Sequence, residues 1–296
     1  MTERQRFFGT LHPLVSFCYF VCVLVLTLLC PNIITVLLSL LGSILFNLSL
    51  RGGKAFAKTL RFVAPMFVII CIGNPLVSHR GVTMLWLFLN QWITLEAIVY
   101  GFVTACSLSA VVLWFGCYQE VMTSDKFLYL FGQIAPATSL LITSALRFIP
   151  QMQATAAQIK ESRAMLQSDS PRLFQKLAHA IQNLSALLGM SMEQSVEMAD
   201  SMKARGFGAR RRTTFHLFRF DARDARTLAF ILTLFAVCII ARCYGHGYME
   251  YYPRITAVVQ GTPSITLFTL FAALMLLPSI LEAKEAIRWK FCGLRI

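Results

Sequence analysis

The side chains that most often carry out chemistry in enzymes are scattered along this chain. Its five histidines have no metal-ligand spacing, and they are His12, His79, His179, His216 and His246. The patterns His-Glu-x-x-His, Gly-x-Ser-x-Gly and Gly-x-x-x-x-Gly-Lys-Ser/Thr are all absent from the sequence. We therefore expect no catalytic residue, no metal site and no cofactor, and we predict that the chain is not an enzyme.

The nine cysteines also lack a redox or zinc pattern, because no two of them form a Cys-x-x-Cys pair. Most lie in or at the ends of apolar runs, namely Cys18, Cys22, Cys30, Cys71, Cys106, Cys117 and Cys238. A buried cysteine behaves as a small hydrophobe. We interpret these residues as packing residues.

One arginine lies at a position suited to docking. The segment Ser201-Met-Lys-Ala-Arg-Gly-Phe-Gly208 places Arg205 at the end of a predicted amphipathic helix over 172–205, directly before Gly206. An arginine near a helix C-terminus offsets the helix dipole and a glycine ends the helix, so local stability alone is one interpretation. The other is that the apolar stripe binds a partner whose carboxylates pair with the planar guanidinium.

A second pattern consists of small residues at four-residue spacing: Ala97, Gly101, Ala105 and Ser109. Such a face allows another helix to approach closely. Packing within the chain and docking of a second membrane subunit are both compatible with it.

These residues are carried by a chain with the composition of a membrane protein. Hydrophobic residues make up 57% of its 296 residues and charged residues only 14%, against about 25% charged in a soluble domain. We predict an all-α polytopic protein with about six membrane-spanning helices, over 14–29, 33–50, 62–77, 97–117, 228–243 and 265–281. The third is the weakest, because Pro65, Gly73 and Pro75 interrupt it. The start lacks the features of a removable signal peptide, so we expect the first segment to be a retained helix.

The basic residues predict the orientation. With both termini in the cytoplasm, all but three of the 27 Lys and Arg (Arg80, Arg242 and Arg254) fall on the inner side. This orientation accounts for the net charge of +13, so we expect no nucleic-acid partner. The spans contain almost no ionisable residues, so any transport must draw its energy from elsewhere.

A long cytoplasmic insert, over 118–226, separates membrane segments 1–117 from segments 227–296 with their basic tail. Its apolar stretch, 134–149, has Pro136 and Pro150 near its ends; an interfacial or insert-core helix and a shallow membrane helix are both open interpretations. A polar helix over 151–167 and a turn at Ser168-Asp169-Ser170-Pro171 follow. For Arg147 and Pro150 we predict a structural role, with snorkelling of Arg147 to the membrane surface as the alternative.

Five short motifs give the chain a resemblance to a known family. They are Asn74-Pro75-Leu76 with His79-Arg80-Gly81, Thr94-Leu95-Glu96-Ala97, Val121-Met-Thr-Ser-Asp-Lys-Phe127, Leu146-Arg147-Phe148-Ile149-Pro150, and Ala204-Arg205-Gly206. With these the chain resembles the transmembrane T component of energy-coupling factor transporters, which is related to the Q component of cobalt and nickel uptake systems.

The resemblance implies a scaffold in a bacterial or archaeal cell membrane. It implies as partners two cytoplasmic ATP-binding-cassette subunits, a substrate-binding membrane S component and the lipid bilayer. Helices in the insert would transmit ATPase motion for vitamin or metal-ion uptake. Family members carry two Ala-Arg-Gly motifs that dock in the ATPases. Ala204, Arg205 and Gly206 match one; Ser162-Arg163-Ala164 is the nearest candidate for the other, and Met165-Leu166-Gln167 aligns as plausibly.

The alternatives to this scaffold are a conventional ABC importer permease and a membrane-embedded lipid-modifying enzyme. A conventional ABC importer permease would require a cytoplasmic Glu-Ala-Ala…Gly loop, which the sequence lacks. A membrane-embedded lipid-modifying enzyme would require converging acidic or histidine residues, and none is evident.

Overall fold

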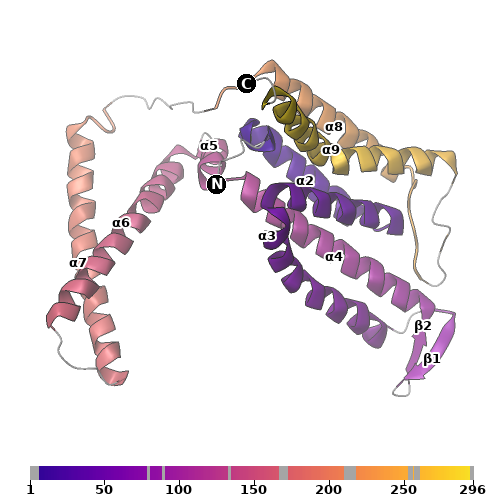
Figure 1. Ribbon diagram of the computed structural model, residues 1–296, viewed down its shortest axis with the longest axis horizontal. Helices are drawn as coiled ribbons and strands as arrows, with labels where there is room; N and C mark the ends of the chain where they lie inside the picture. Colours follow the sequence, from indigo (N-terminus) through magenta and orange to yellow (C-terminus); the bar gives the residue numbers. More distant parts are fainter. Residues whose placement is uncertain are drawn as a thin grey trace. The chain divides into compact units, whose positions relative to one another are not determined.

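The computed structural model describes residues 7–78, 81–88, 91–132, 135–166, 173–209, 218–252, 256 and 261–293. The helices and strands, all except α1 labelled in Figure 1, are α1 (Phe7–Thr10), α2 (Pro13–Leu29), α3 (Ile33–Val77), β1 (Met84–Phe88), β2 (Gln91–Thr94), α4 (Leu95–Val121), α5 (Ser124–Gly132), α6 (Pro136–Leu166), α7 (Leu173–Ala204), α8 (Ala222–Cys243) and α9 (Thr262–Gly293). The predictions for His79, Arg80, Ile134, 168–171, Arg172, 210–212, His216 and Arg254 lie outside the described residues.

The chain divides into two compact units. Unit 1 comprises Met1–Phe127 and Phe218–Ile296, and unit 2 comprises Leu128–Leu217. The boundaries of unit 2 fall inside the predicted insert, 118–226, because α4 continues to Val121 and α8 begins at Ala222.

Unit 1 contains the apolar helices. Within the described residues, five helices are long and apolar enough to cross a membrane: Ile33–Gly53, Phe56–Val77, Leu95–Val121, Ala222–Cys243 and Thr262–Lys284. The first predicted span, 14–29, corresponds to Pro13–Leu29, which is apolar but has only 17 residues, or about 25 Å of helix against a hydrocarbon core of about 30 Å. The architecture is therefore that of a multi-pass membrane protein, and the count of six spans stays a prediction.

The second and third predicted spans form one bent helix, α3. Within it Gly52 has φ 72° and ψ 168°, which is not helical, and a positive φ of this size favours glycine. The Arg51 guanidinium spans the bend: Nη2 donates to the Gly116 carbonyl at 2.9 Å, Nη1 donates to Thr59 Oγ1 at 3.4 Å, and Nε lies 3.3 Å from Glu120 Oε2. Both halves of α3 are thus tied to each other and to α4.

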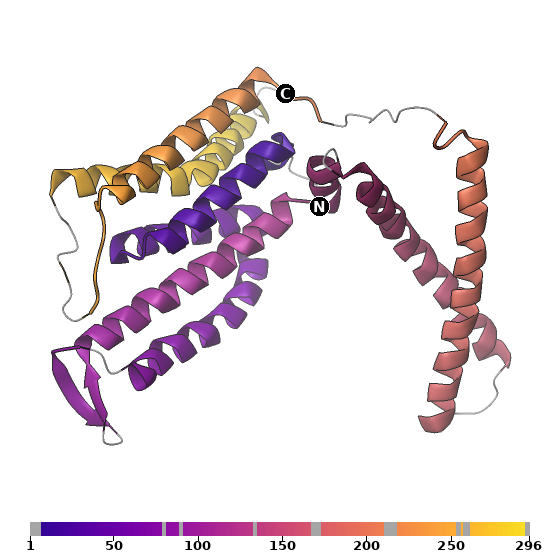
Figure 2. The same ribbon diagram turned by 180° about the vertical axis from the view of Figure 1, so that it is seen from behind.

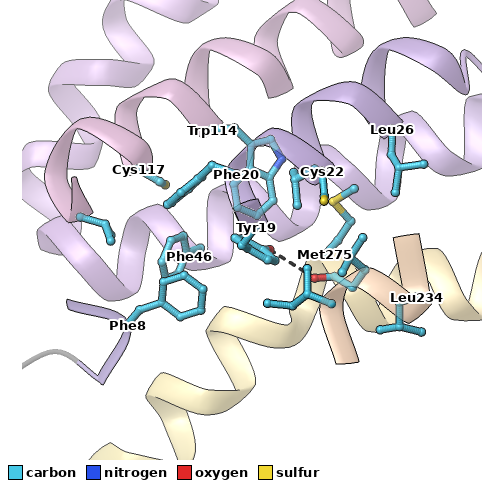
Figure 3. Packing of buried hydrophobic residues seen from close by; sticks show 14 of the residues in the cluster. Phe8, Tyr19, Phe20, Cys22, Leu26, Phe46, Trp114, Cys117, Leu234 and Met275 are labelled. Carbon is cyan, nitrogen blue, oxygen red and sulfur yellow. Dashed lines mark hydrogen bonds between the residues drawn. The ribbon is translucent and has the colours of Figure 1, made fainter. Parts of the chain in front are cut away.

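The core of unit 1 is rich in aromatic rings. Phe8, Tyr19, Phe20, Phe46 and Trp114 are at most 1% exposed, and their rings meet mostly edge to face (Figure 3). Tyr19 also donates a hydrogen bond to the Leu274 carbonyl of α9 at 3.2 Å. These contacts join residues of α1, α2, α3, α4 and α9. The described cysteines are all free thiols, and five of them are buried.

A short antiparallel hairpin, β1–β2, precedes α4, with Leu87 opposite Trp92 and Phe88 opposite Gln91. The predicted all-α architecture is confirmed in its coarse, helical form, but it did not include this hairpin. Aromatic and β-branched residues are frequent in residues 84–94, and such residues favour strands. This segment lies between the third and fourth predicted spans, and no element is predicted for it from the sequence.

Unit 2 consists mainly of α6 and α7, which pack against each other (Figure 2). The helical character predicted for 134–149 and 151–167 is confirmed where the structure describes these segments, and they form one helix, because α6 runs continuously through Pro150. A proline inside a helix removes one backbone hydrogen bond and bends the helix, but it need not end it. None of the described residues of unit 2 is buried, which distinguishes it from unit 1.

Candidate docking surface on the helical pair

The end of α7 has a well-defined geometry. The Phe207 amide donates to the Met202 carbonyl at 3.0 Å, and the Gly206 amide donates to the Lys203 carbonyl at 2.9 Å. Together with φ 79° at Gly206, this is a Schellman motif, which commonly ends helices at a glycine. Arg205 is therefore the C-cap residue, and its backbone direction is fixed by two hydrogen bonds.

The side chain of Arg205 extends from this fixed backbone. The residue is exposed, and in the part of the chain that the structure describes no acceptor bonds its guanidinium. A cation at a helix C-terminus is favoured by the dipole, which explains why a basic residue is stable there. Because no described acceptor bonds the guanidinium, its five N–H donors are available for a planar anion such as a carboxylate.

An apolar stripe leads along α7 toward Arg205. Its members recur at three- and four-residue spacing and are each more than half exposed: Phe174, Leu177, Ile181, Leu184, Leu188, Met192 and Val196. Phe174 reaches 88% and Met192 72% exposure. Exposed apolar area of this extent commonly marks an interaction surface. We define these seven residues as the α7 stripe.

The second predicted docking residue, Arg163, is in a different situation. Its Nη1 donates to the His179 carbonyl at 3.3 Å and to Gln182 Oε1 at 3.0 Å. Arg163 therefore links α6 to α7 inside unit 2. Of its neighbours, Ser162 is exposed, and Ala164 lies in the last turn of α6. The structure thus brings Arg163 to the helix pair and leaves Arg205 projecting from it.

Arg147 and Pro150 lie in the first half of α6 and are both exposed. The surrounding residues Leu140, Leu141, Ile142, Leu146 and Ile149 are exposed as well. Three of these are consecutive, so the apolar surface here is not confined to one face of the helix. Arg147 is thus a single charge within an apolar half-helix.

The small-residue face of α4 is occupied within the chain. Ala97, Gly101, Ala105 and Ser109 are all buried. A Cβ at Gly101 would lie 3.0 Å from Asn74 Cβ and 3.3 Å from Pro75 Cδ, so the second half of α3 packs directly on it. This arrangement agrees with packing inside the chain, the first of the two interpretations of the pattern.

No local pattern in the sequence indicates that Arg163 donates to the His179 carbonyl and to Gln182 Oε1, because these hydrogen bonds join two different helices. The geometry of Arg205, in contrast, follows from residues 201–208 alone. Among the described residues no group of three or more His, Cys, Asp or Glu is placed to hold a metal ion.

Neither protein-family models nor curated protein sequences match this chain.

Proposed function

We propose that the chain is the membrane scaffold of an ATP-driven importer of the energy-coupling factor type, the T component that its motifs resemble. Its unit 1 would lie in a bacterial or archaeal cell membrane with both termini in the cytoplasm. Two ATP-binding-cassette subunits would dock on unit 2, and a separate S component would bind the vitamin or metal ion. The chain itself would contribute no catalytic group.

The observation that carries this proposal is the combination at the end of α7. A helix end closed by a Schellman motif presents an exposed Arg205 that has no bonded acceptor among the described residues, nine residues beyond Val196, the last member of the α7 stripe. A groove with acidic residues on a folded partner would fit this surface, because arginine and large apolar residues dominate binding energies at protein interfaces. The apolar helices of unit 1 support a role in the membrane.

The proposal is tested by purifying the full-length chain from its native membrane and identifying the ATP-binding-cassette subunits that accompany it. We expect Arg205→Glu to weaken their binding at least about thirty-fold, since truncating or reversing a buried charge pair costs about 2–5 kcal/mol. Lys203→Glu is the matched control, because Lys203 is exposed, lies two residues away and is paired with Asp200 at 3.8 Å. We expect it to change binding less than threefold.

Arg163→Glu separates the two arginines. We expect it to act on the packing of α6 against α7 and to affect both ATPases through it, with a smaller loss of binding than Arg205→Glu. A wild-type chain that purifies without an ATPase, or an Arg205→Glu chain whose complex is undiminished, would refute the proposed function.

A further inference from the structure

The polypeptide leaves unit 1 after Phe127 and returns to it at Phe218. We call the residues on the unit 1 side of these crossings the outgoing root (Ser124 to Phe127) and the returning root (Phe218 to Asp224). A third piece of chain, residues 8–12, contacts both roots. All three belong to unit 1, so their contacts are defined within one compact unit.

Lys126 makes the contact at the outgoing root. It is only 7% exposed, and its ammonium donates to the Gly9 carbonyl at 2.7 Å and to the Val121 carbonyl at 3.0 Å. Gly9 lies in the last turn of α1, and Val121 is the last residue of α4. Both carbonyls are among those that a helix end leaves without an intrahelical partner. One lysine therefore joins two helix C-termini.

This position is unfavourable for Lys126 in two other respects. It lies in the first turn of α5, where the helix dipole disfavours a cation. Burial also lowers the pKa of Lys126, which reflects the cost of removing an ammonium from water. The hydrogen bonds to the two carbonyls must offset both effects. The contact with Gly9 is therefore needed to stabilise the buried ammonium in the outgoing root.

His12 makes the contact at the returning root. Its ring meets the Phe220 ring edge to face, with centroids 5.1 Å apart and planes at 84°. Asp224, in the first turn of α8, is 4% exposed and acts electrostatically on the same imidazole. In the described part of the chain, Asp224 Oδ1 is buried without a hydrogen-bond partner.

The intervening segment is itself anchored. Phe8 is completely buried among Tyr19, Phe20 and Phe46, and its carbonyl accepts a hydrogen bond from Ser16 Oγ at 3.4 Å. Only two residues, Thr10 and Leu11, separate Gly9 from His12. A displacement of one root therefore acts on the other through a short, buried piece of chain.

We infer that residues 8–12 form a joint that couples the outgoing and returning roots, with Lys126 and Phe220 as the positioning residues on its two sides. Both roots are then held to the same anchored segment, so that loosening one root loosens the other. Transmission of ATPase motion through this joint rests on the proposed function, whereas the coupling of the roots does not.

The experiment measures hydrogen–deuterium exchange of the full-length chain in lipid nanodiscs, without any partner. Lys126→Met keeps the aliphatic stem but removes all three donors. We expect exchange to accelerate about tenfold in α5 and also in the first turn of α8, which Lys126 does not touch. Lys58→Met is the matched control, since Lys58 is exposed, and it should leave both roots unchanged.

Phe220→Leu provides the reciprocal measurement and covers the case in which the lysine variant fails to fold. Coupling between two sites is reciprocal, so the loss of the ring contact with His12 should accelerate exchange in α5. Acceleration restricted to the mutated root in either variant would overturn the inference. Because no ATPase is present, this outcome is independent of whether the proposed function is correct.

Discussion

Unit 1 and unit 2 are both helical, but among the described residues only unit 1 buries large apolar side chains completely. In unit 1, Trp114, Tyr19 and Phe271 are completely buried among helices far apart in the sequence. In unit 2, Phe174, Leu177 and Met192 are each at least 60% exposed. The difference indicates that a core of its own specifies the fold of unit 1, whereas the described residues of unit 2 form no such core.

The largest difference in unfolding free energy should appear when one buried apolar side chain of unit 1 and one exposed apolar side chain of unit 2 are each truncated to alanine. Trp114→Ala removes a fully buried ring whose Nε1 donates to Ser39 Oγ at 3.1 Å, and should cost about 3–5 kcal/mol of unfolding free energy. Leu184→Ala, at a position 56% exposed, should change it by about 0.5 kcal/mol or less. Denaturant unfolding of the full chain in detergent measures both. Equal losses would contradict the comparison.

Removal of a charged side chain should also lower the unfolding free energy more in unit 1 than in unit 2. Arg51 bonds Gly116 and Thr59 and pairs with Glu120, so Arg51→Met should cost about 2 kcal/mol, the scale of hydrogen bonds to a charged group. The Lys203–Asp200 pair in unit 2 has side chains at least 70% exposed. Lys203→Met should therefore change the unfolding free energy by less than about 0.5 kcal/mol. A larger effect of Lys203→Met would show that unit 2 depends on its surface charges.

Two glycines in unit 2 offer a smaller and sharper test. Gly206→Ala forces a side chain into φ 79° and should cost about 1–2 kcal/mol at the end of α7. Gly189 lies inside the same helix with no atom within 4 Å of an added Cβ. Gly189→Ala should therefore stabilise α7 by about 0.5–1 kcal/mol. Hydrogen exchange of the α7 amides measures both. Destabilisation by both changes would mean that α7 is constrained along its whole length.

The smallest effect concerns pH and His12 in unit 1. Burial lowers the pKa of His12, although the negative charge of Asp224 acts in the opposite direction. The unfolded chain then binds a proton more readily, so the stability contribution is present above about pH 6.5 and is lost as the pH falls through the lowered value.

His12→Asn should flatten this part of the profile while keeping the cap, because an asparagine oxygen also accepts from the Leu14 amide. Melting temperatures of the full chain between pH 5 and pH 8 measure the effect. An unchanged pH profile in His12→Asn would show that another group is responsible.

The sequence allowed the helical membrane architecture and the end of α7 to be predicted, because both depend on local patterns. Hydrophobic length indicates the spans, and the Arg205–Gly206 pair indicates a helix end. The hairpin β1–β2 was missed because hydrophobicity alone does not separate a short strand from a connection. The continuity of α6 was missed because the effect of Pro150 depends on the rest of the helix.

Contacts between distant residues could not be predicted at all. Nothing near Arg163 in the sequence indicates that it bonds His179 and Gln182, and nothing near Lys126 indicates its bond to Gly9. The role proposed for Arg163 came from a partial motif, and its contacts depend on how α6 and α7 pack. The sequence therefore predicts the helix-end position of Arg205, whereas it does not predict the contacts of Arg163 with α7.

The division of unit 1 between two stretches of sequence also has a consequence for biosynthesis. Core residues Ile231, Leu234, Phe271 and Leu274 follow the whole of unit 2, Leu128–Leu217, on the nascent chain. At about 5–20 residues per second, the ribosome needs roughly 5–20 s to synthesise such a segment. During this interval α2, α3 and α4 lack the contacts that α8 and α9 later make with their aromatic core.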